Sequence, residues 1–407
     1  MEAQARKLRK LNKNQIRGVK GYSILSCVPL IDIGTCVLPE YMHSVLLGVV
    51  KQLIKLWFDK KGPWNIKKKS KDIDNFITSI RPLQSFCRLP RPLTYYQFYK
   101  ASENYNFLLF YSLPALIDHL PNKYFQHWMM LVIALFNLLQ SEITQFDLKQ
   151  SDILLKLFVK QFEKLYGDRE LTYNTHQLRH LTLCVERWGP LWATSAFPFE
   201  NYNGFIAKCV HGNKHLGQEI VNNLLIAQGV QILKSRAIER KRNVNNVQCN
   251  MRSKSYELLG KYITNIEFNN IERHLLIYEG FELINVKIFA RAKINGEIFT
   301  SEIYKVTKTN SHVVQIDTND GSSVYYGSIR YFSEIHNDLY FILNCFTVEN
   351  IKMFYHLETN SKVKHIIPVK KSGDFMLFKL KDIKSICQVL KVDDYICKRP
   401  NTVKQIW

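Results

Sequence analysis

The pattern of apolar and polar residues predicts a helical region followed by a region rich in strands. From about Asp32 to Lys234 the apolar spacing is typical of α-helices. After about Leu275 it changes to short runs of β-branched and aromatic residues, separated by turn sequences such as Asn295–Gly296. The order predicts an α+β protein, with a mostly helical N-terminal block and a small antiparallel β-rich domain at the C-terminal end.

Two of the predicted helices have distinctive features. Glu40–Phe58 is apolar on nearly all sides, which indicates a buried helix. Pro114 lies inside another helix and should kink or divide it, because proline has no N–H to donate. The predicted helices are Glu40–Phe58, Ser102–Leu120, Tyr124–Leu139, Ser151–Tyr166, Asn174–Trp188 and Leu216–Leu233.

The strand-rich region is predicted to form a small antiparallel barrel or sheet, the simplest way to bury several short strands. Its predicted strands are Phe281–Phe289, Glu297–Val306, Val313–Ile316, Val324–Phe332, Leu339–Phe346 and Phe375–Phe378.

Composition divides the chain into four parts. Residues 1–20 form a basic arm, which is either a phosphate-binding or nuclear-import segment or a frayed terminus. Residues 21–235 form the helical block, and residues 275–400 form the β-rich domain. Residues 236–274 are polar and basic, and we interpret them as a linker.

The charge balance favours a polyanionic partner. The chain has 56 Lys and Arg against 35 Asp and Glu, a formal net charge of +21. Such an excess is typical of nucleic-acid-binding proteins, although a scattered, solvated basic surface is the alternative. DNA is therefore the expected partner. The candidate phosphate contacts are Lys67, Lys68 and Lys69 in a lysine-rich loop, Lys60–Lys71, and Arg240, Lys241 and Arg242 in the linker.

The cysteines and apolar runs indicate an intracellular protein. The chain has 9 cysteines, an odd number with no Cys-x-x-Cys pair, and Met1–Lys20 lacks the apolar core of a secretory signal. We therefore expect free thiols in a reducing compartment, and a nuclear location if the partner is DNA. Met129–Leu139 is far shorter than the roughly 20 apolar residues of a membrane span, so no membrane partner is expected.

Two pairs of residues have spacings that suit a structural metal site. Glu40 and His43 are three apart on one predicted helix, and His176 and His180 are four apart on another. These spacings place each pair on one helix face. If the two faces met, three imidazoles and a carboxylate would offer four ligands to zinc. The alternative is that the histidines are hydrogen-bonded in a core or simply exposed.

Glu200 is an acidic residue among apolar neighbours at the start of a helical stretch, Phe197–Gly204. A carboxylate here could bind Mg²⁺ for phosphoryl transfer. Alternatively, it could interact with the helix dipole or be a buried structural residue. A metal-dependent strand-cutting site needs at least three converging acids, and Glu200 is only one of them.

At these motifs the sequence resembles transposases of the CACTA (En/Spm) superfamily, particularly animal transposase-domain proteins with a ribonuclease-H-like core. The resemblance covers roughly Gly18–Gln231 and is looser in the β-rich region, at Tyr326–Ile329 and Asn344–Phe346. Its motifs are Gly18–Ser23, Pro39–Leu56, Arg88–Arg91, Lys100–Glu103, Leu165–Gly167, Tyr173–Leu181, Gly189–Trp192 and Phe197–Gly204.

The resemblance implies roles for individual residues. Glu200 takes the place of the third catalytic acid, whereas segments that match the two catalytic Asp residues are missing and Asp32 matches neither. His43 matches the His of the family's D-x-x-H motif, with Glu40 in place of the usual Asp or Cys. In the related V(D)J recombinase such a pair joins two histidines to hold zinc, which assigns that role to His176 and His180.

Three hypotheses follow. The first is a transposon-derived DNA-binding protein that lacks two of the three catalytic acids and binds DNA or other transposase chains. The second is an active transposase that uses Mg²⁺ once further segments or a partner chain complete its site. The third is a domesticated chromatin scaffold that binds other proteins.

Overall fold

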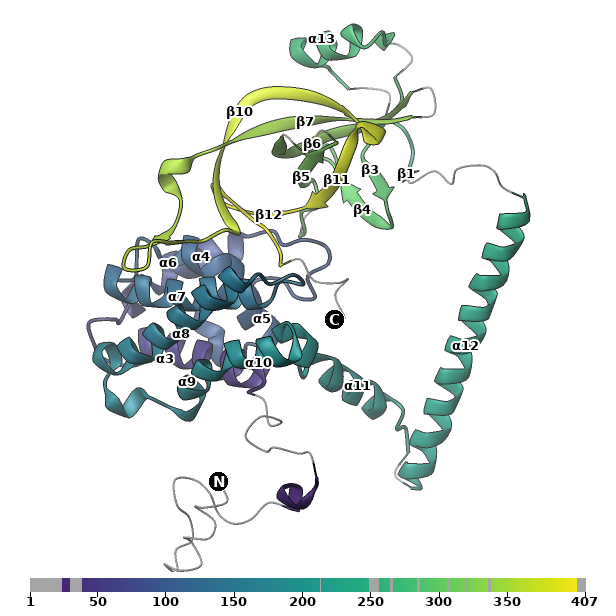
Figure 1. The fold of residues 1–407 in the computed structure, drawn as a ribbon. Coiled ribbons are helices and arrows are strands. Elements are labelled where there is room, and N and C mark those ends of the chain that lie inside the picture. The colour runs from purple at the N-terminus through teal and green to yellow at the C-terminus, as the bar shows by residue number, and fades with distance from the viewer. Residues whose placement is uncertain are drawn as a thin grey trace, which may run out of the picture.

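The predicted α+β class is confirmed: helices occupy the N-terminal part and antiparallel strands the C-terminal part. The computed structural model describes residues 24–29, 39–212, 214–248, 256–263, 266–283, 286–305, 308–319, 321, 323–335 and 338–400. Figure 1 shows the helical block with the β-rich part above it, and the long helix α12 (Leu216–Gln248) standing away from both.

The helical block is built around α7 (Asn122–Leu138), most of whose side chains are buried. Trp57 meets Trp128 of α7 edge-on, with ring centroids 5.1 Å apart. The predicted buried helix is present as η2 (Met42–Val50), a π-helix, continued by α3 (Lys51–Asp59). The other helical elements of the block are η3 (Lys67–Lys69), α4 (Ser70–Ser79), η4 (Leu93–Phe98), α5 (Ala101–Asn106), η5 (Phe107–Tyr111), α6 (Ser112–Leu116), α8 (Gln145–Tyr166), η6 (Asp168–Glu170), α9 (Tyr173–Gln177), η7 (Leu178–His180), α10 (Leu181–Trp188), η8 (Leu191–Thr194) and α11 (Phe197–Lys208). The short element η1 (Ile24–Cys27) precedes them.

The interruption expected at Pro114 takes the form of the π-helical segment η5, which joins α5 to α6. Proline has no N–H for the carbonyls one turn before it. The ring of His365 contacts the Leu109 oxygen through Nε2 at 2.8 Å, and Cys397 Sγ donates to the Phe110 oxygen at 3.4 Å. The residue before β10 and the end of β13 therefore supply contacts that the proline cannot.

The main sheet follows the order β11-β5-β6-β7-β10-β13-β12, with β2 paired to β6. Only Val389 separates β11 from β12 in sequence, so the two ends of this path meet and the sheet is curled like a barrel (Figure 1). A smaller sheet has the order β1-β3-β4, and β8 pairs with β9. The strands are β1 (Tyr256–Leu259), β2 (Ile288–Phe289), β3 (Arg291–Ile294), β4 (Glu297–Thr300), β5 (Val313–Thr318), β6 (Val324–Ile335), β7 (Asp338–Val348), β8 (Tyr355–His356), β9 (Ser361–Lys362), β10 (Ile366–Lys379), β11 (Ile383–Gln388), β12 (Leu390–Val392) and β13 (Tyr395–Cys397), with the short helical turns η10 (Asn350–Lys352) and η11 (Leu380–Asp382) between them.

Several predicted boundaries differ from the observed ones. The interval 236–274, interpreted as a linker, contains the end of α12, the paired strand β1 and the start of α13 (Asn270–Tyr278). β1 is fixed by its pairing with β3, a long-range contact that local composition does not show. The predicted loop Lys60–Lys71 likewise contains η3 and the start of α4.

The helical block and the β-rich part share one hydrophobic core. Buried residues of the C-terminal region pack into the same cluster as α7, although the sequence predicts separate domains. Lys364 adds an ion pair to Asp147 of α8, with Nζ and Oδ1 2.7 Å apart. The C-terminal residues in this core are Phe354, Val363, Ile366, Leu390, Val392 and Cys397.

The other sequence-based expectations concern thiols and membranes. Every cysteine among the described residues is a free thiol, as expected. No helix in the described ranges has both the length and the apolar character that crossing a bilayer requires.

Gly327 is expected to be the glycine whose replacement costs most in the β-rich part. An added Cβ would lie 2.4 Å from the Asn344 carbonyl oxygen and 2.7 Å from Leu343 Cγ, both in strand β7. Gly327→Ala should therefore lower the free energy of unfolding by about 2 to 3 kcal/mol, measured by urea denaturation. Gly229→Ala on α12, where nothing lies within 4 Å, is the control and should be neutral or slightly stabilising. Equal effects of the two substitutions would contradict the prediction.

Candidate functional site

Glu40 links two elements that are far apart in sequence. Its Oε1 accepts N–H groups from Met42, at 2.9 Å, and from Ala196, at 3.0 Å. Its Oε2 accepts the N–H of His43 at 2.9 Å. The carboxylate therefore caps the start of η2 and joins it to the residue that precedes α11.

His43 lies between two carboxylates. Its Nδ1 is 2.8 Å from Glu40 Oε2, and its Nε2 is 3.1 Å from Glu200 Oε1 on α11. The imidazole and the Glu200 side chain are about half exposed. The ring therefore bridges the two carboxylates, with one ring nitrogen facing each of them. The structure thus brings together Glu40, His43 and Glu200, three of the predicted site residues.

His176 and His180 form a second, separate pair on α9 and η7. Their Nε2 atoms are 3.4 Å apart. Burial, followed by the neighbouring His176 and Arg179, lowers the pKa of His180. Two nitrogens bound to one tetrahedral zinc ion would lie roughly 3.3 Å apart, given Zn–N bonds of about 2.0 to 2.1 Å. The pair has the spacing that two zinc ligands need.

The two motif-bearing elements do pack together, but not through their predicted ligands. A Cβ on Gly48 of η2 would lie 2.6 Å from the Asn174 amide of α9, so the helices meet there. Gln52 Oε1 accepts the Thr172 hydroxyl at 3.1 Å in the same contact. Among the described residues no three His, Cys, Asp or Glu side chains are grouped as a metal site requires. The four-residue zinc site stays a prediction.

Zinc binding can be measured directly. If the pair is a zinc ligand set, purified protein should carry about one zinc ion per chain, and His176→Ala should lose it. The measurement is elemental analysis after dialysis against a weak chelator. His274→Ala, which removes an exposed imidazole on α13, is the control and should keep the metal. Equal zinc content in the His176 variant and the unmodified protein would rule out the predicted cluster.

The structure describes the side chains of only some of the residues predicted to contact phosphate. Lys67, Lys68 and Lys69 form the exposed turn η3 before α4, and none of them has an ion pair within the described part of the chain. Their charges are therefore available to an anion. The side chains of Arg240, Lys241 and Arg242 lie outside the described residues, as do Asp32 and Gly18–Ser23.

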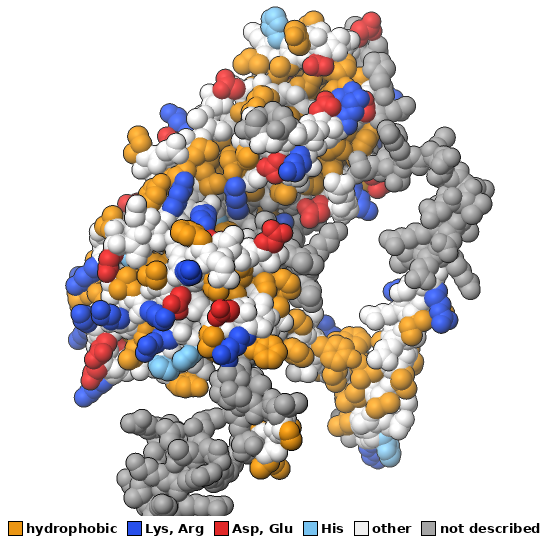
Figure 2. Space-filling view, in the orientation of Figure 1, with side chains coloured by type: hydrophobic (Ala, Val, Ile, Leu, Met, Phe, Trp, Pro, Cys, Tyr) orange, Lys and Arg blue, Asp and Glu red, His pale blue; other side chains and the backbone are white. Residues whose placement is uncertain are grey.

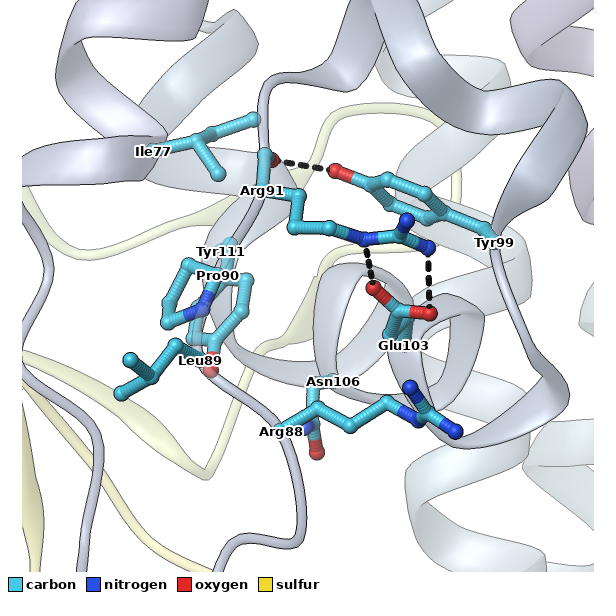
Figure 3. Close-up of a pocket in the computed structure, with 9 residues that line it drawn as sticks. All are labelled: Ile77, Arg88, Leu89, Pro90, Arg91, Tyr99, Glu103, Asn106 and Tyr111. Carbon is cyan, nitrogen blue, oxygen red and sulfur yellow. Dashed lines mark hydrogen bonds and ion pairs between the residues drawn. The ribbon is translucent and has the colours of Figure 1, made fainter.

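A cluster of charged and aromatic residues that the sequence did not reveal lies beside α5 (Figure 3). Arg91 makes a two-pronged contact with Glu103, with Nε–Oε1 at 2.6 Å and Nη2–Oε2 at 2.8 Å. The guanidinium also lies over the Tyr99 ring, 5.4 Å from its centroid. Both residues belong to motifs of the CACTA resemblance, Arg88–Arg91 and Lys100–Glu103, but their pairing has no local sequence signal.

Comparison with protein family models, with curated proteins and with solved structures finds no match to this chain. The resemblance to CACTA transposases therefore rests on the motifs alone.

Proposed function

We propose that this chain is a transposon-derived DNA-binding protein that offers one acid, Glu200, of the three that metal-dependent strand cutting requires. The net charge of +21 supports a polyanionic partner. The Lys67–Lys69 turn is exposed and has no ion pair among the described residues, which supports phosphate contact. Figure 2 shows basic side chains spread over the helical block, with acidic ones among them.

The contact between His43 and Glu200 carries the proposal. These residues are 157 positions apart, yet their side chains lie 3.1 Å from each other. They match two separate motifs of the transposase resemblance, which would have to converge in a common catalytic core. Their adjacency supports the transposase origin, because a chance resemblance would place the motifs independently.

A paired assay tests the proposal. The purified chain should retard duplex DNA in a gel-shift experiment, and the same mixture with Mg²⁺ should leave nicked and intact DNA unchanged. Glu200→Gln should bind DNA like the unmodified chain. Cleavage or joining that requires Mg²⁺ and disappears in Glu200→Gln would contradict the missing-acid part of the proposal. Failure to retard DNA would contradict its binding part.

A second candidate, a transposase completed by further polypeptide, is favoured by the helix that carries Glu200. None of the residues of α11 is buried, and Phe199, Tyr202 and Phe205 are 71%, 50% and 40% exposed. Figure 2 shows that apolar side chains cover α11 and the adjoining part of α12. Apolar surface of this extent is typical of a contact face. An open reading frame upstream that encodes two spaced Asp segments would support this candidate, and stop codons there would contradict it.

A further inference from the structure

A pocket opens where the helical block meets the end of the β-rich part. Its interior is small, about 50 Å³, and it opens to solvent, so a ligand would lie partly in its mouth. Its residues come from the segment before η4, from α5 and η5, and from the residues after β13: Ser85, Phe86, Cys87, Arg88, Ser102, Tyr105, Asn106, Phe110 and Arg399.

The charge in this pocket is positive and uncompensated. Arg88 and Arg399 both line it, and no carboxylate is among the lining residues. Arg399 donates to the Ser85 hydroxyl at 3.2 Å, and within the described residues Arg88 has no ion pair. Two guanidinium groups in one concavity repel each other, so an anion between them would be stabilised. Guanidinium pairs bind phosphate oxygens with matching geometry.

The pocket also has an aromatic wall. Phe86 and Phe110 are 5.7 Å apart between ring centroids, and Tyr105 meets Phe110 edge-on at 6.0 Å. Phe110 and Tyr105 are buried, so the partly exposed Phe86 ring is the surface on which a nucleobase can stack. Ser102 and Asn106, on the α5 side, add a hydroxyl and an amide for polar contacts.

The arginine from the C-terminal end is held in place by its neighbours. Cys397 is fully buried against the Phe110 carbonyl, and the Lys398 N–H donates to the His365 oxygen at 2.8 Å. These contacts fix the backbone that carries Arg399.

We propose that this pocket binds one nucleotide unit, with its phosphate between Arg88 and Arg399 and its base against Phe86. The unit belongs to a nucleic-acid strand or to a free mononucleotide, which share this chemistry. Binding of a nucleic-acid strand here rests on the proposed DNA binding, whereas binding of a free mononucleotide does not depend on it.

The test measures fluorescence anisotropy of a labelled single-stranded oligonucleotide, with AMP, adenosine and inorganic phosphate as competitors. Arg88→Gln/Arg399→Gln should weaken binding of the oligonucleotide roughly thirty-fold, because each substitution removes a charge-assisted phosphate contact. The control Lys149→Gln/Lys160→Gln removes the same charge from exposed positions on α8 and should weaken it only about two-fold. AMP should compete better than adenosine or phosphate.

A second variant keeps both arginines and guards against loss of folding. Ser102→Glu adds a carboxylate near the start of α5, where the helix dipole favours it. Its charge repels phosphate, so it should reduce nucleotide binding as strongly as the double arginine substitution. Unchanged affinity in both pocket variants would overturn the inference while leaving DNA binding in place. If AMP binds but no oligonucleotide does, the proposed function fails and the pocket assignment stands. Equal competition by phosphate and AMP would overturn the base-stacking part.

Discussion

Acid is expected to unfold this protein well above the pH at which its carboxylates titrate. Burial lowers the pKa of His127 to about 3 and the pKa of His365 to about 3 as well. Each ring stacks on a phenylalanine, His127 on Phe158 at 4.0 Å and His365 on Phe136 at 3.9 Å between centroids. Each also contacts a backbone carbonyl oxygen through Nε2. Neither ring can gain a charge without losing this packing.

The sign of the effect follows from proton uptake. An unfolded histidine binds a proton below about pH 6.5, whereas these two remain neutral in the folded protein down to about pH 3. The unfolded state therefore binds more protons in that window, and stability falls as the pH falls through it. Each histidine should lower the free energy of unfolding by about 1.4 kcal/mol for each unit that the pH falls in this window.

Urea denaturation at several pH values between 6 and 4 measures this slope. His365→Gln keeps a side-chain N–H for the Leu109 carbonyl but cannot take up a proton, so it should reduce the slope by about 1.4 kcal/mol per pH unit. His127→Gln should do the same, and the two effects should add. A slope that neither substitution changes would show that the buried histidines do not govern acid unfolding.

The second large effect is expected at Arg91. Glu103 is only 6% exposed, and Arg91 is the cation that pairs with its carboxylate. The hydrogen bonds that Arg91 donates to Glu103 raise the pKa of Arg91 above its usual value. Glu103 also accepts the Lys100 N–H at 2.9 Å, which caps the start of α5. Arg91→Met would leave a buried, unpaired charge and should cost about 3 to 5 kcal/mol.

A double-variant cycle separates the buried charge from lost packing. Glu103→Gln keeps an acceptor for Lys100 and removes the charge, so Arg91→Met/Glu103→Gln should be more stable than Arg91→Met alone. Chemical denaturation of the four proteins gives the coupling. Strict additivity of the two single effects would mean that the ion pair contributes nothing measurable.

The sequence predicted elements whose signal is local. The helix Glu40–Phe58 could be predicted because its apolar residues follow a helical period, although its first half forms the π-helix η2. The short helix α4 was not predicted because a run of lysines precedes the apolar spacing of Ile73, Phe76 and Ile77. The first half of β10 escaped because it contains Pro368 and two adjacent lysines, which are unusual inside a strand.

The candidate site was predictable only in part, for the same reason. A separation of three places Glu40 and His43 on one face, and they are in contact. The contact of His43 with Glu200 was not predicted, and the grouping with His176 and His180 needed a helix packing that spacing cannot specify. Arg88 and Arg399 come together only because β13 docks on η5, so no local pattern connects them.

Salt dependence of DNA binding tests the central claim most directly. The affinity for a labelled duplex, measured by anisotropy between about 50 and 200 mM NaCl, should fall on the order of a thousand-fold if several phosphates are contacted. Lys67→Ala/Lys68→Ala/Lys69→Ala should make the slope of log affinity against log salt concentration less steep, by the amount expected for about three lost phosphate contacts. An affinity that stays constant across this range, or no binding at all, would contradict the account.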